Sequence, residues 1–303
     1  MDDFLGEMMA QLSGWNLFTG FVALYLGLIV GSFLNVVIYR WPLQRSIVLP
    51  GSACGACGVP LRIWNNIPVL SYLVQRGCCS FCGAPFSIRY MAIEALCGSF
   101  AVFLLWFQGG FGWAWLYLFT FFCIATAVFF TDLDHWIIPD ELNLFGLIFG
   151  CLGGIWMANR GDMAILRDLF GGLMIGRFEG LQSALDYSVA GNLASSGLGA
   201  LVGIAFFMFI QFMGLVVARQ EAMGDGDVKY AAVLGAFLGW QQALAAFFLS
   251  FLLGAVVAIP LMLFSRGRGK DPIPFGTFMS VAAVVVALWG DWLWVKIGYF
   301  EWY

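Results

Sequence analysis

The sequence predicts an all-α polytopic membrane protein with about eight transmembrane helices. Of its 303 residues, 62% are hydrophobic, and the mean hydropathy is +0.90. Only 11% are charged, against roughly 25% in soluble domains, so the chain lacks the polar side chains to cover a soluble fold. The net charge of −4 and the lack of a Lys- and Arg-rich run argue against nucleic-acid binding, which needs clustered cations to meet phosphates.

The individual spans follow from apolar stretches of about 17–25 residues, the length at which a helix crosses a bilayer. These stretches predict helices over residues 17–38, 90–107, 113–130, 138–157, 198–217, 230–240, 241–264 and 276–296, of which the sixth is short for a span. Two polar segments interrupt them. The chain is therefore divided into an N-terminal segment with the first helix (1–38), a polar loop domain (39–89) and a transmembrane core (90–303), which contains an extended connection at residues 158–197.

The orientation follows from the cations, most of which fall on the side of the predicted spans that holds residues 39–89. Lys and Arg are enriched in cytoplasmic loops, so this side is predicted to be cytoplasmic and residues 158–197 periplasmic. The N-terminal segment has Asp2, Asp3 and Glu7 but no cation before Arg40, unlike a cleavable secretory signal. We expect the first span to be retained, with the N-terminus in the periplasm.

Four cysteines in the polar loop have the spacing of a metal site. Cys54, Cys57, Cys79 and Cys82 form two C-x2-C pairs, the arrangement of a four-cysteine zinc ribbon. Disulfides or free thiols are the alternatives, but disulfides seldom persist in the cytoplasm, so zinc is favoured. Cys78 is an alternative ligand that would make the second pair C-x3-C. The segment is predicted to be a zinc-ribbon-like cytoplasmic loop domain.

Two short acidic strings carry the strongest functional signal. Asp132 lies in TDLDHWIIPD (131–140), where the third span ends, and Asp227 lies in MGDGDVK (223–229), just before the sixth. Ionisable groups near membrane depth are costly and mark functional sites. Both strings fall at cytoplasmic helix ends, so the two side chains are predicted to meet. Two neighbouring carboxylates share a proton, which provides the base and the acid that peptide hydrolysis requires, although the sequence does not assign the roles.

Several neighbours of this pair are candidates for substrate contact. Two residues spaced i, i+2 point in different directions, so only one Asp of each string is expected to reach the centre. The supporting candidates are Asp134, Gly224, Asp225, Gly226 and Lys229, together with the intramembrane Glu94. Asp140 follows Pro139 and is read as a helix N-cap, and the single histidine, His135, is read as an interfacial residue.

Taken together, these blocks resemble the bacterial type IV prepilin peptidase family, also called leader peptidase/N-methyltransferase. The similarity runs through GSFLNVVIYRWP (31–42), the cysteine pairs, NNIPVLSYL (65–73), RYMAIEAL (89–96), TDLDHWIIPD (131–140), MGDGDVKYAAVLGAFLGW (223–240) and IPFGTF (273–278). The blocks occur in the family's order and cover most of the chain except residues 158–197. The G-x-G-D string alone is a weak signal, but the combination is specific.

The resemblance implies an eight-span aspartic protease of the inner membrane in which Asp132 and Asp227 are catalytic. It also implies cleavage after the Gly that ends a basic leader of type IV prepilins or pseudopilins, and then methylation of the new N-terminus with S-adenosylmethionine. The cysteine-bearing loop accompanies that second activity in the family. The sequence has no glycine-rich nucleotide fingerprint after a strand, so no residue is assigned to the methyl donor.

Two rival functions stay open at this level. A peptidase without methyltransferase activity would use the cysteine loop only to grip its substrate. A proton- or cation-coupled transporter would also place acids in the membrane, but such proteins often show inverted repeats, which we do not find here.

Overall fold

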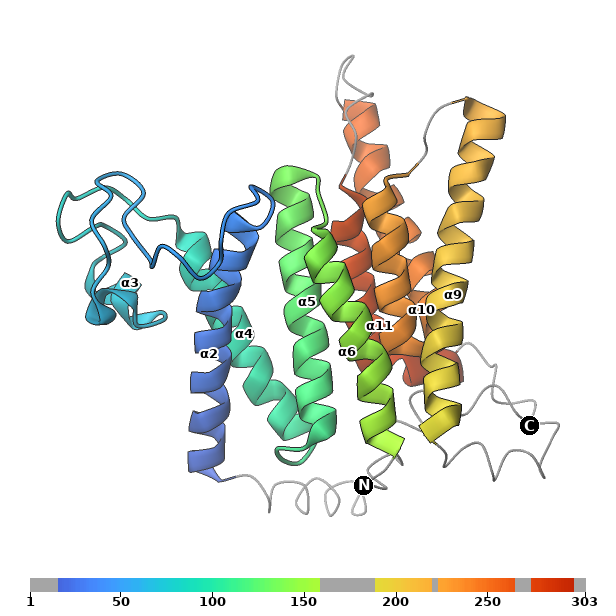
Figure 1. Ribbon diagram of the computed structural model, residues 1–303, viewed down its shortest axis with the longest axis horizontal. Coiled ribbons are helices and arrows are strands. Elements are labelled where there is room, and N and C mark those ends of the chain that lie inside the picture. The colour runs from blue at the N-terminus through green and yellow to red at the C-terminus, as the bar shows by residue number, and fades with distance from the viewer. Residues whose placement is uncertain (1–15, 159–188, 220–222, 265–273, 297–303) are drawn as a thin grey trace. The chain divides into compact units, whose positions relative to one another are not determined.

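The computed structural model describes residues 16–158, 189–219, 223–264 and 274–296 (Figure 1). These residues are mostly helical and contain no strand, as the predicted fold class requires. The chain separates into two compact units, Met1–Cys123 and Ile124–Tyr303. The long helix α5 (Trp113–His135) contributes residues to both.

The first unit pairs two long helices and carries the polar loop domain. The helices are α2 (Leu17–Arg40) and α4 (Ile88–Phe107), and the short elements η1 (Ile63–Asn66) and α3 (Leu70–Val74) lie between them in the chain. Asn16 begins α2 with a capping box, because its side chain accepts the N–H of Thr19 while the Thr19 hydroxyl oxygen accepts the N–H of Asn16. Ser87 caps α4 with a single hydrogen bond, in which its hydroxyl oxygen accepts the N–H of Arg89, so a local side chain begins each helix.

Small residues bring α2 and α4 together. Gly27 and Gly31 lie one turn apart on α2, and a Cβ at Gly31 would come within 2.7 Å of the Glu94 backbone. Gly98 faces them from α4, where a Cβ would come within 2.9 Å of the Leu28 side chain. In a lipid environment this small-xxx-small pattern allows two backbones to approach and gain van der Waals contact. Figure 1 shows the two helices side by side.

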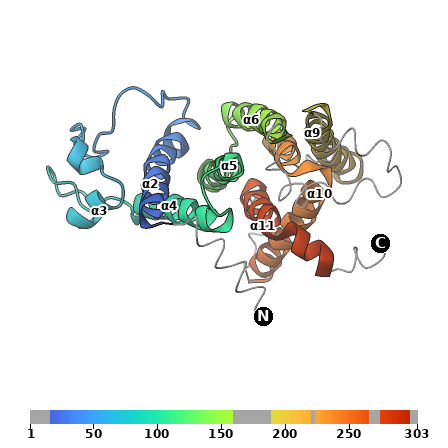
Figure 2. The same cartoon turned by 90° about the horizontal axis from the view of Figure 1, so that it is seen from below.

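The second unit is a bundle of helices that pack around α10. It contains α6 (Asp140–Ala158), α9 (Val189–Met213) with the π-helical turn η2 (Gly214–Ala218), α10 (Asp225–Phe264) and α11 (Phe275–Lys296). Helix α9 packs on α10 along its length, and α6 and α11 also contact α10, as Figure 2 shows from below. Gly199 of α9 meets Gly235 of α10 so closely that a Cβ on either would overlap the other's backbone.

The eight predicted spans all find helical counterparts, with changed boundaries. Predicted spans six and seven lie in α10, which breaks at Gly239 (φ 72°, ψ 166°). The short sixth span is longer than predicted, because α10 begins at Asp225. Helix α9 begins at Val189, so residues 189–197 belong to a helix and not to the extended connection. The rest of that connection, residues 159–188, lies outside the described residues, as does most of the N-terminal segment.

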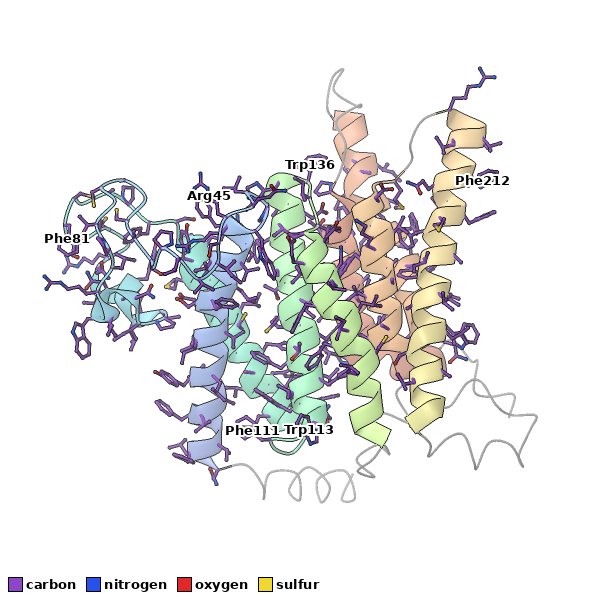
Figure 3. All side chains as sticks on the ribbon, viewed as in Figure 1. Arg45, Phe81, Phe111, Trp113, Trp136 and Phe212 are labelled. Carbon is purple, nitrogen blue, oxygen red and sulfur yellow. The ribbon has the colours of Figure 1, made fainter. Side chains whose placement is uncertain are left out.

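Five of the described helices are long and apolar enough to cross a membrane. They are α2, α4, α5, Leu193–Val217 and Asp225–Pro260, the last of which contains the break at Gly239. The protein is thus a multi-pass membrane protein, and the number eight stays a prediction. Figure 3 shows Phe111 and Trp113 at the turn between α4 and α5, the kind of position that aromatic residues favour at a membrane interface.

Candidate functional site

Three helices bring the two predicted aspartates together. Asp132 lies near the C-terminal end of α5 and Asp227 in the first turn of α10, and their side chains are within electrostatic range of one another. Asp132 is 6% exposed, whereas Asp227 is half-buried. Their partners at i+2 and i−2, Asp134 and Asp225, are both exposed. One acid from each string thus reaches the shared site, as the i, i+2 spacing predicts.

The third helix, α11, holds Asp132 with its N-terminus. The backbone N–H of Thr277 donates to Asp132 Oδ2 at 3.0 Å, and the backbone of Gly276 also hydrogen-bonds to this carboxylate. The first N–H groups of a helix have no partner within it and carry the positive end of its dipole. The Asp132 carboxylate therefore fills the role of a cap for α11, and α11 in return fixes its orientation.

Gly276 is the tightest position in this arrangement. A Cβ there would lie 3.0 Å from Asp132 Oδ2 and 2.9 Å from Cδ1 of Ile138. By contrast, a Cβ at Gly224 or Gly226 would make only ordinary contacts, at 3.6 Å from Asp227 Oδ2 and 3.4 Å from Ile138 Cβ. Within the protein, close packing at the acid pair needs the glycine of α11 and not those of the G-x-G-D string.

A pair of buried hydroxyls ties α10 to the start of α11. Ser280 donates to the Gly276 carbonyl at 2.8 Å, and its oxygen lies 3.0 Å from the hydroxyl of Tyr230. Because the single Ser280 proton is already used, the Tyr230 hydroxyl is the donor between them. Tyr230 lies one turn after Asp227 and is fully buried. The same helix thus presents Asp227 and, through Ser280, braces the turn that holds Asp132.

The exposed residues around the pair have partners of their own. Lys229 pairs with Asp140 at 2.7 Å, which links the first turns of α10 and α6. Asp140 is the first residue of α6 and the Pro139 carbonyl accepts the N–H of Asn143, so the predicted N-cap lies one residue earlier. Asp225 Oδ1 accepts from Gln211 Nε2 at 3.1 Å. His135 ends α5 and is half-buried.

The four predicted metal ligands form one cluster in the loop domain. The sulfur atoms of Cys54, Cys57, Cys79 and Cys82 all lie within 4.8 Å of one another, and those of Cys54 and Cys82 are 3.8 Å apart. Tetrahedral zinc with bonds of about 2.3 Å to sulfur requires S–S distances of about 3.8 Å, so the cluster fits this ion. Cys78 is not part of this cluster, which favours the C-x2-C spacing for the second pair.

A local repeat builds this cluster. Residues 53–60 (ACGACGVP) and 78–85 (CCSFCGAP) each close with a bridge between their first and last residues, Ala53 with Pro60 and Cys78 with Pro85. In each, the first ligand cysteine accepts an N–H from the glycine that follows the second cysteine, Gly58 or Gly83, and both glycines have φ near +70°. Cys78 thus occupies the place of Ala53, outside the group of four sulfur atoms.

The backbone also prepares the cluster for a cation. Hydrogen bonds from the backbone N–H groups of Cys57 and Ala56 lower the pKa of the Cys54 thiol to about 6. A hydrogen bond from the Ala84 backbone favours the Cys82 thiolate, but desolvation and the neighbouring cysteines outweigh it and raise the pKa of Cys82 to about 12. Four neighbouring cysteines repel one another once they are deprotonated to thiolates, and a bound divalent cation stabilises the thiolate form.

Glu94, the other predicted site residue, belongs to the first unit. It is 9% exposed, and its Oε2 accepts the backbone N–H of Val69 at 2.7 Å. Val69 has φ 60° and ψ −51°, and Leu70 donates to the Pro68 carbonyl at 2.6 Å across it. This is a γ-turn with positive φ, which is strained for any residue with a Cβ and more so for a β-branched one.

These features define a class of protein: a multi-pass helical membrane protein with a paired-aspartate centre and a four-cysteine loop. Comparison with known proteins narrows the class. A model described as the type IV leader peptidase family matches residues 118–259, and one described as the bacterial peptidase A24 N-terminal domain matches residues 25–108. The chain belongs to the type IV leader peptidase family.

Relatives of this chain cover most of its length. It is 33% identical to a prepilin leader peptidase/N-methyltransferase of Stutzerimonas stutzeri, over 89% of this chain and 90% of the relative. Proteins of the same name are 31% identical in Pseudomonas aeruginosa, over 88% of this chain and 89% of the relative, and 38% identical in Myxococcus xanthus, over 80% and 63%. No solved structure matches.

Sequence reasoning missed the residues that support the acid pair. IPFGTF (273–278) was part of the resemblance, but Gly276 and Thr277 had no assigned role, and Tyr230 and Ser280 were not singled out. A signal for Gly276 was present, since a glycine directly after a proline–phenylalanine pair is a poor helix former at a helix start. The hydroxyl pair left no such signal, because a tyrosine and a serine 50 residues apart show no pattern.

Proposed function

We propose that this chain is a membrane aspartic endopeptidase that removes the basic leader of type IV prepilins or pseudopilins and then methylates the new N-terminus. The single observation that supports the proposal is that Asp132 and Asp227, from helices far apart in the chain, lie within electrostatic range of one another, with Asp132 bonded to the N-terminus of α11. The family and its bifunctional relatives support the same reading.

The proposed cleavage uses the pair as one acid and one base. One carboxylate takes a proton from a water molecule, which attacks the scissile carbonyl. The other, protonated, donates a hydrogen bond to that carbonyl oxygen and later gives its proton to the departing amine. The backbone N–H groups of Gly276 and Thr277 keep the Asp132 side chain in one orientation through these steps, so that no free energy is spent on ordering it.

The substrate would enter with its apolar stem in the bilayer and its basic leader at the acidic rim of the site. Glu141 and Asp225 provide negative charge there, while the charge of Asp140 is compensated by Lys229. Attraction of this kind acts over about 8 Å at physiological ionic strength and weakens as salt rises. We place the centre at the cytoplasmic face of the bacterial inner membrane, with the N-terminus in the periplasm, on the positive-inside distribution of Lys and Arg.

Two bound groups belong to the proposal. The four-cysteine cluster would hold a zinc ion that fixes the fold of the loop domain, since its ligand set and spacing are those of structural zinc sites. S-adenosylmethionine would supply an electrophilic methyl group for the new amino terminus. The described residues of this chain contain no strand-turn-helix unit of the nucleotide-binding type, and no residue is assigned to this donor.

Co-expression with a candidate prepilin, followed by intact-mass measurement, tests the proposal in one spectrum. Loss of the leader mass reports cleavage, and an added CH2 on the product reports methylation. Asp132→Asn and Asp227→Asn should each abolish cleavage, because each removes one member of the acid–base pair while keeping its size. Full cleavage by either variant would remove that residue from the pair, and cleavage without an added CH2 would favour the peptidase-only alternative.

A further inference from the structure

The first unit contains a buried carboxylate that the peptidase mechanism does not use. Glu94 is 9% exposed, and the only hydrogen bond to it from the described residues is the N–H of Val69 on Oε2. Buried carboxylates are normally neutralised by a cation or by several donors. Glu94 therefore has room for one more partner, which should be positive.

The surroundings of Glu94 are closely packed on the side of α2 and have a strained backbone turn on the side of the loop. Gly31 of α2 packs directly on its backbone, and Asn35, one turn further along α2, donates to the Tyr90 carbonyl at 3.0 Å, one turn before Glu94 on α4. The loop side is the positive-φ turn at Val69, held in place by the Glu94 carboxylate itself. Backbone strain of this kind persists where the surrounding structure enforces it, and such positions concentrate at functional sites.

We infer that Glu94 is the receiving carboxylate for an ammonium group in the methyl-transfer reaction, an inference that rests on the proposed function. The reaction offers that chemistry twice: in the new N-terminus of the cleaved pilin and in the amino group of the methyl donor. For the pilin terminus, Glu94 would take one proton from the ammonium. The free nitrogen pair then forms the C–N bond as the C–S bond breaks and its electrons remain on sulfur, leaving a methylated ammonium and a thioether.

The matched pair Glu94→Gln and Glu94→Ala separates this role from a purely structural one. Glutamine keeps an acceptor for the Val69 N–H but has no charge, whereas alanine removes both. We expect Glu94→Gln to cleave co-expressed prepilin as the wild type does and to leave the product unmethylated, as read by intact mass. A Glu94→Gln variant that methylates normally overturns the inference, and so does one that also loses cleavage, because that marks a structural residue.

A binding measurement on the full-length protein in detergent provides a readout independent of methyl transfer. The probe is a synthetic peptide with the mature pilin N-terminus, either with a free amine or N-acetylated. Loss of a charged hydrogen bond should weaken binding of the free-amine peptide to Glu94→Gln about tenfold or more, and leave the acetylated peptide unchanged. If instead S-adenosylhomocysteine weakens tenfold while 5′-methylthioadenosine, which lacks the amino group, does not, the ammonium is that of the methyl donor. If the wild type and Glu94→Gln bind each of the two peptides and the two nucleosides with equal affinity, the inference is overturned. A wild type that binds but never methylates would count against the proposed function alone.

Discussion

Asp132 and Asp227 differ in whether the contacts that position them come from nearby or from distant parts of the chain. Asp227 sits in the first turn of its own helix, and its backbone N–H donates to the Gly224 carbonyl. Asp132 lies at the end of a helix whose dipole disfavours a carboxylate, and it is held by the N-terminus of another helix, 145 residues away. At the scale of single residues, the supporting contacts of the pair are therefore mostly long-range.

Gly276→Ala should impair cleavage strongly without unfolding the protein. The added Cβ would meet Asp132 Oδ2 at 3.0 Å and Ile138 at 2.9 Å, so the carboxylate must shift. A displacement of about 1 Å in a catalytic group can cost about 100-fold in rate, and we expect a loss between about 10-fold and 100-fold in kcat. The control is Gly254→Ala, whose Cβ would find its nearest neighbour, Phe278, at 3.7 Å. Equal cleavage rates for the two variants would contradict the role given to Gly276.

At the scale of elements, close packing between helices depends on where glycines lie on the facing surfaces. Gly199 and Gly203 of α9 face Gly235 and Ala231 of α10, so both helices use small residues at the same spacing. Hydrophobicity cannot drive this contact in lipid, and close van der Waals packing takes its place. The sequence shows these residues, but it does not tell which of many glycines in an apolar chain face a partner.

Gly199→Ala should lower the thermal stability of the detergent-solubilised protein. Its Cβ would overlap the Gly235 carbonyl, and the two helices would have to separate. Overpacking of this kind costs about 1–3 kcal/mol. Gly197→Ala is the matched control two residues earlier on the same helix, where a Cβ meets nothing within 4 Å. A thermal unfolding assay should order the proteins as wild type and Gly197→Ala together, with Gly199→Ala melting earlier.

The cysteine cluster gives an element-scale prediction for metal content. The purified wild type should carry one zinc per chain by elemental analysis, Cys78→Ser should carry the same, and Cys82→Ser should carry less, because Cys82 belongs to the cluster and Cys78 does not. Zinc binding must displace the thiol protons, so affinity should fall as pH falls and be lost once the pH drops well below the Cys54 pKa of about 6. Zinc loss from Cys78→Ser would instead assign the ion to another ligand set.

At the scale of the whole molecule, the sequence predicted the order of the helices well and their number less firmly. Hydropathy located all eight segments because apolar length is a strong signal. It misplaced the start of α9 by nine residues, since residues 189–197 are rich in Gly, Ser and Ala and weakly apolar. The predicted boundary between the sixth and seventh segments, at residues 240 and 241, lies next to Gly239, where the backbone of α10 departs from helical dihedral angles. The cysteine cluster could be predicted from the sequence, because the two cysteines of each pair are close together in the chain.

The orientation of the protein in the membrane gives a prediction for the whole molecule. The positive-inside distribution assigns residues 39–89 to the cytoplasm and the turn at Gly109 and Gly110, after α4, to the periplasm. Alkaline phosphatase needs disulfides and is active only in the periplasm. Fusions after Gly110 should be active and fusions after Arg76 inactive. The reverse pattern would place the acid pair on the outer side, where a prepilin leader is not found.

The eight-residue repeat around the cysteines has a consequence for how such a site can arise. Each copy supplies two thiols and closes on itself through one bridge and one glycine, so neither copy depends on the other for its shape. Duplication of a single hairpin would then double a two-thiol half-site into a complete tetrahedron in one genetic event. The rest of the loop, which supplies no metal ligand, could then change in sequence.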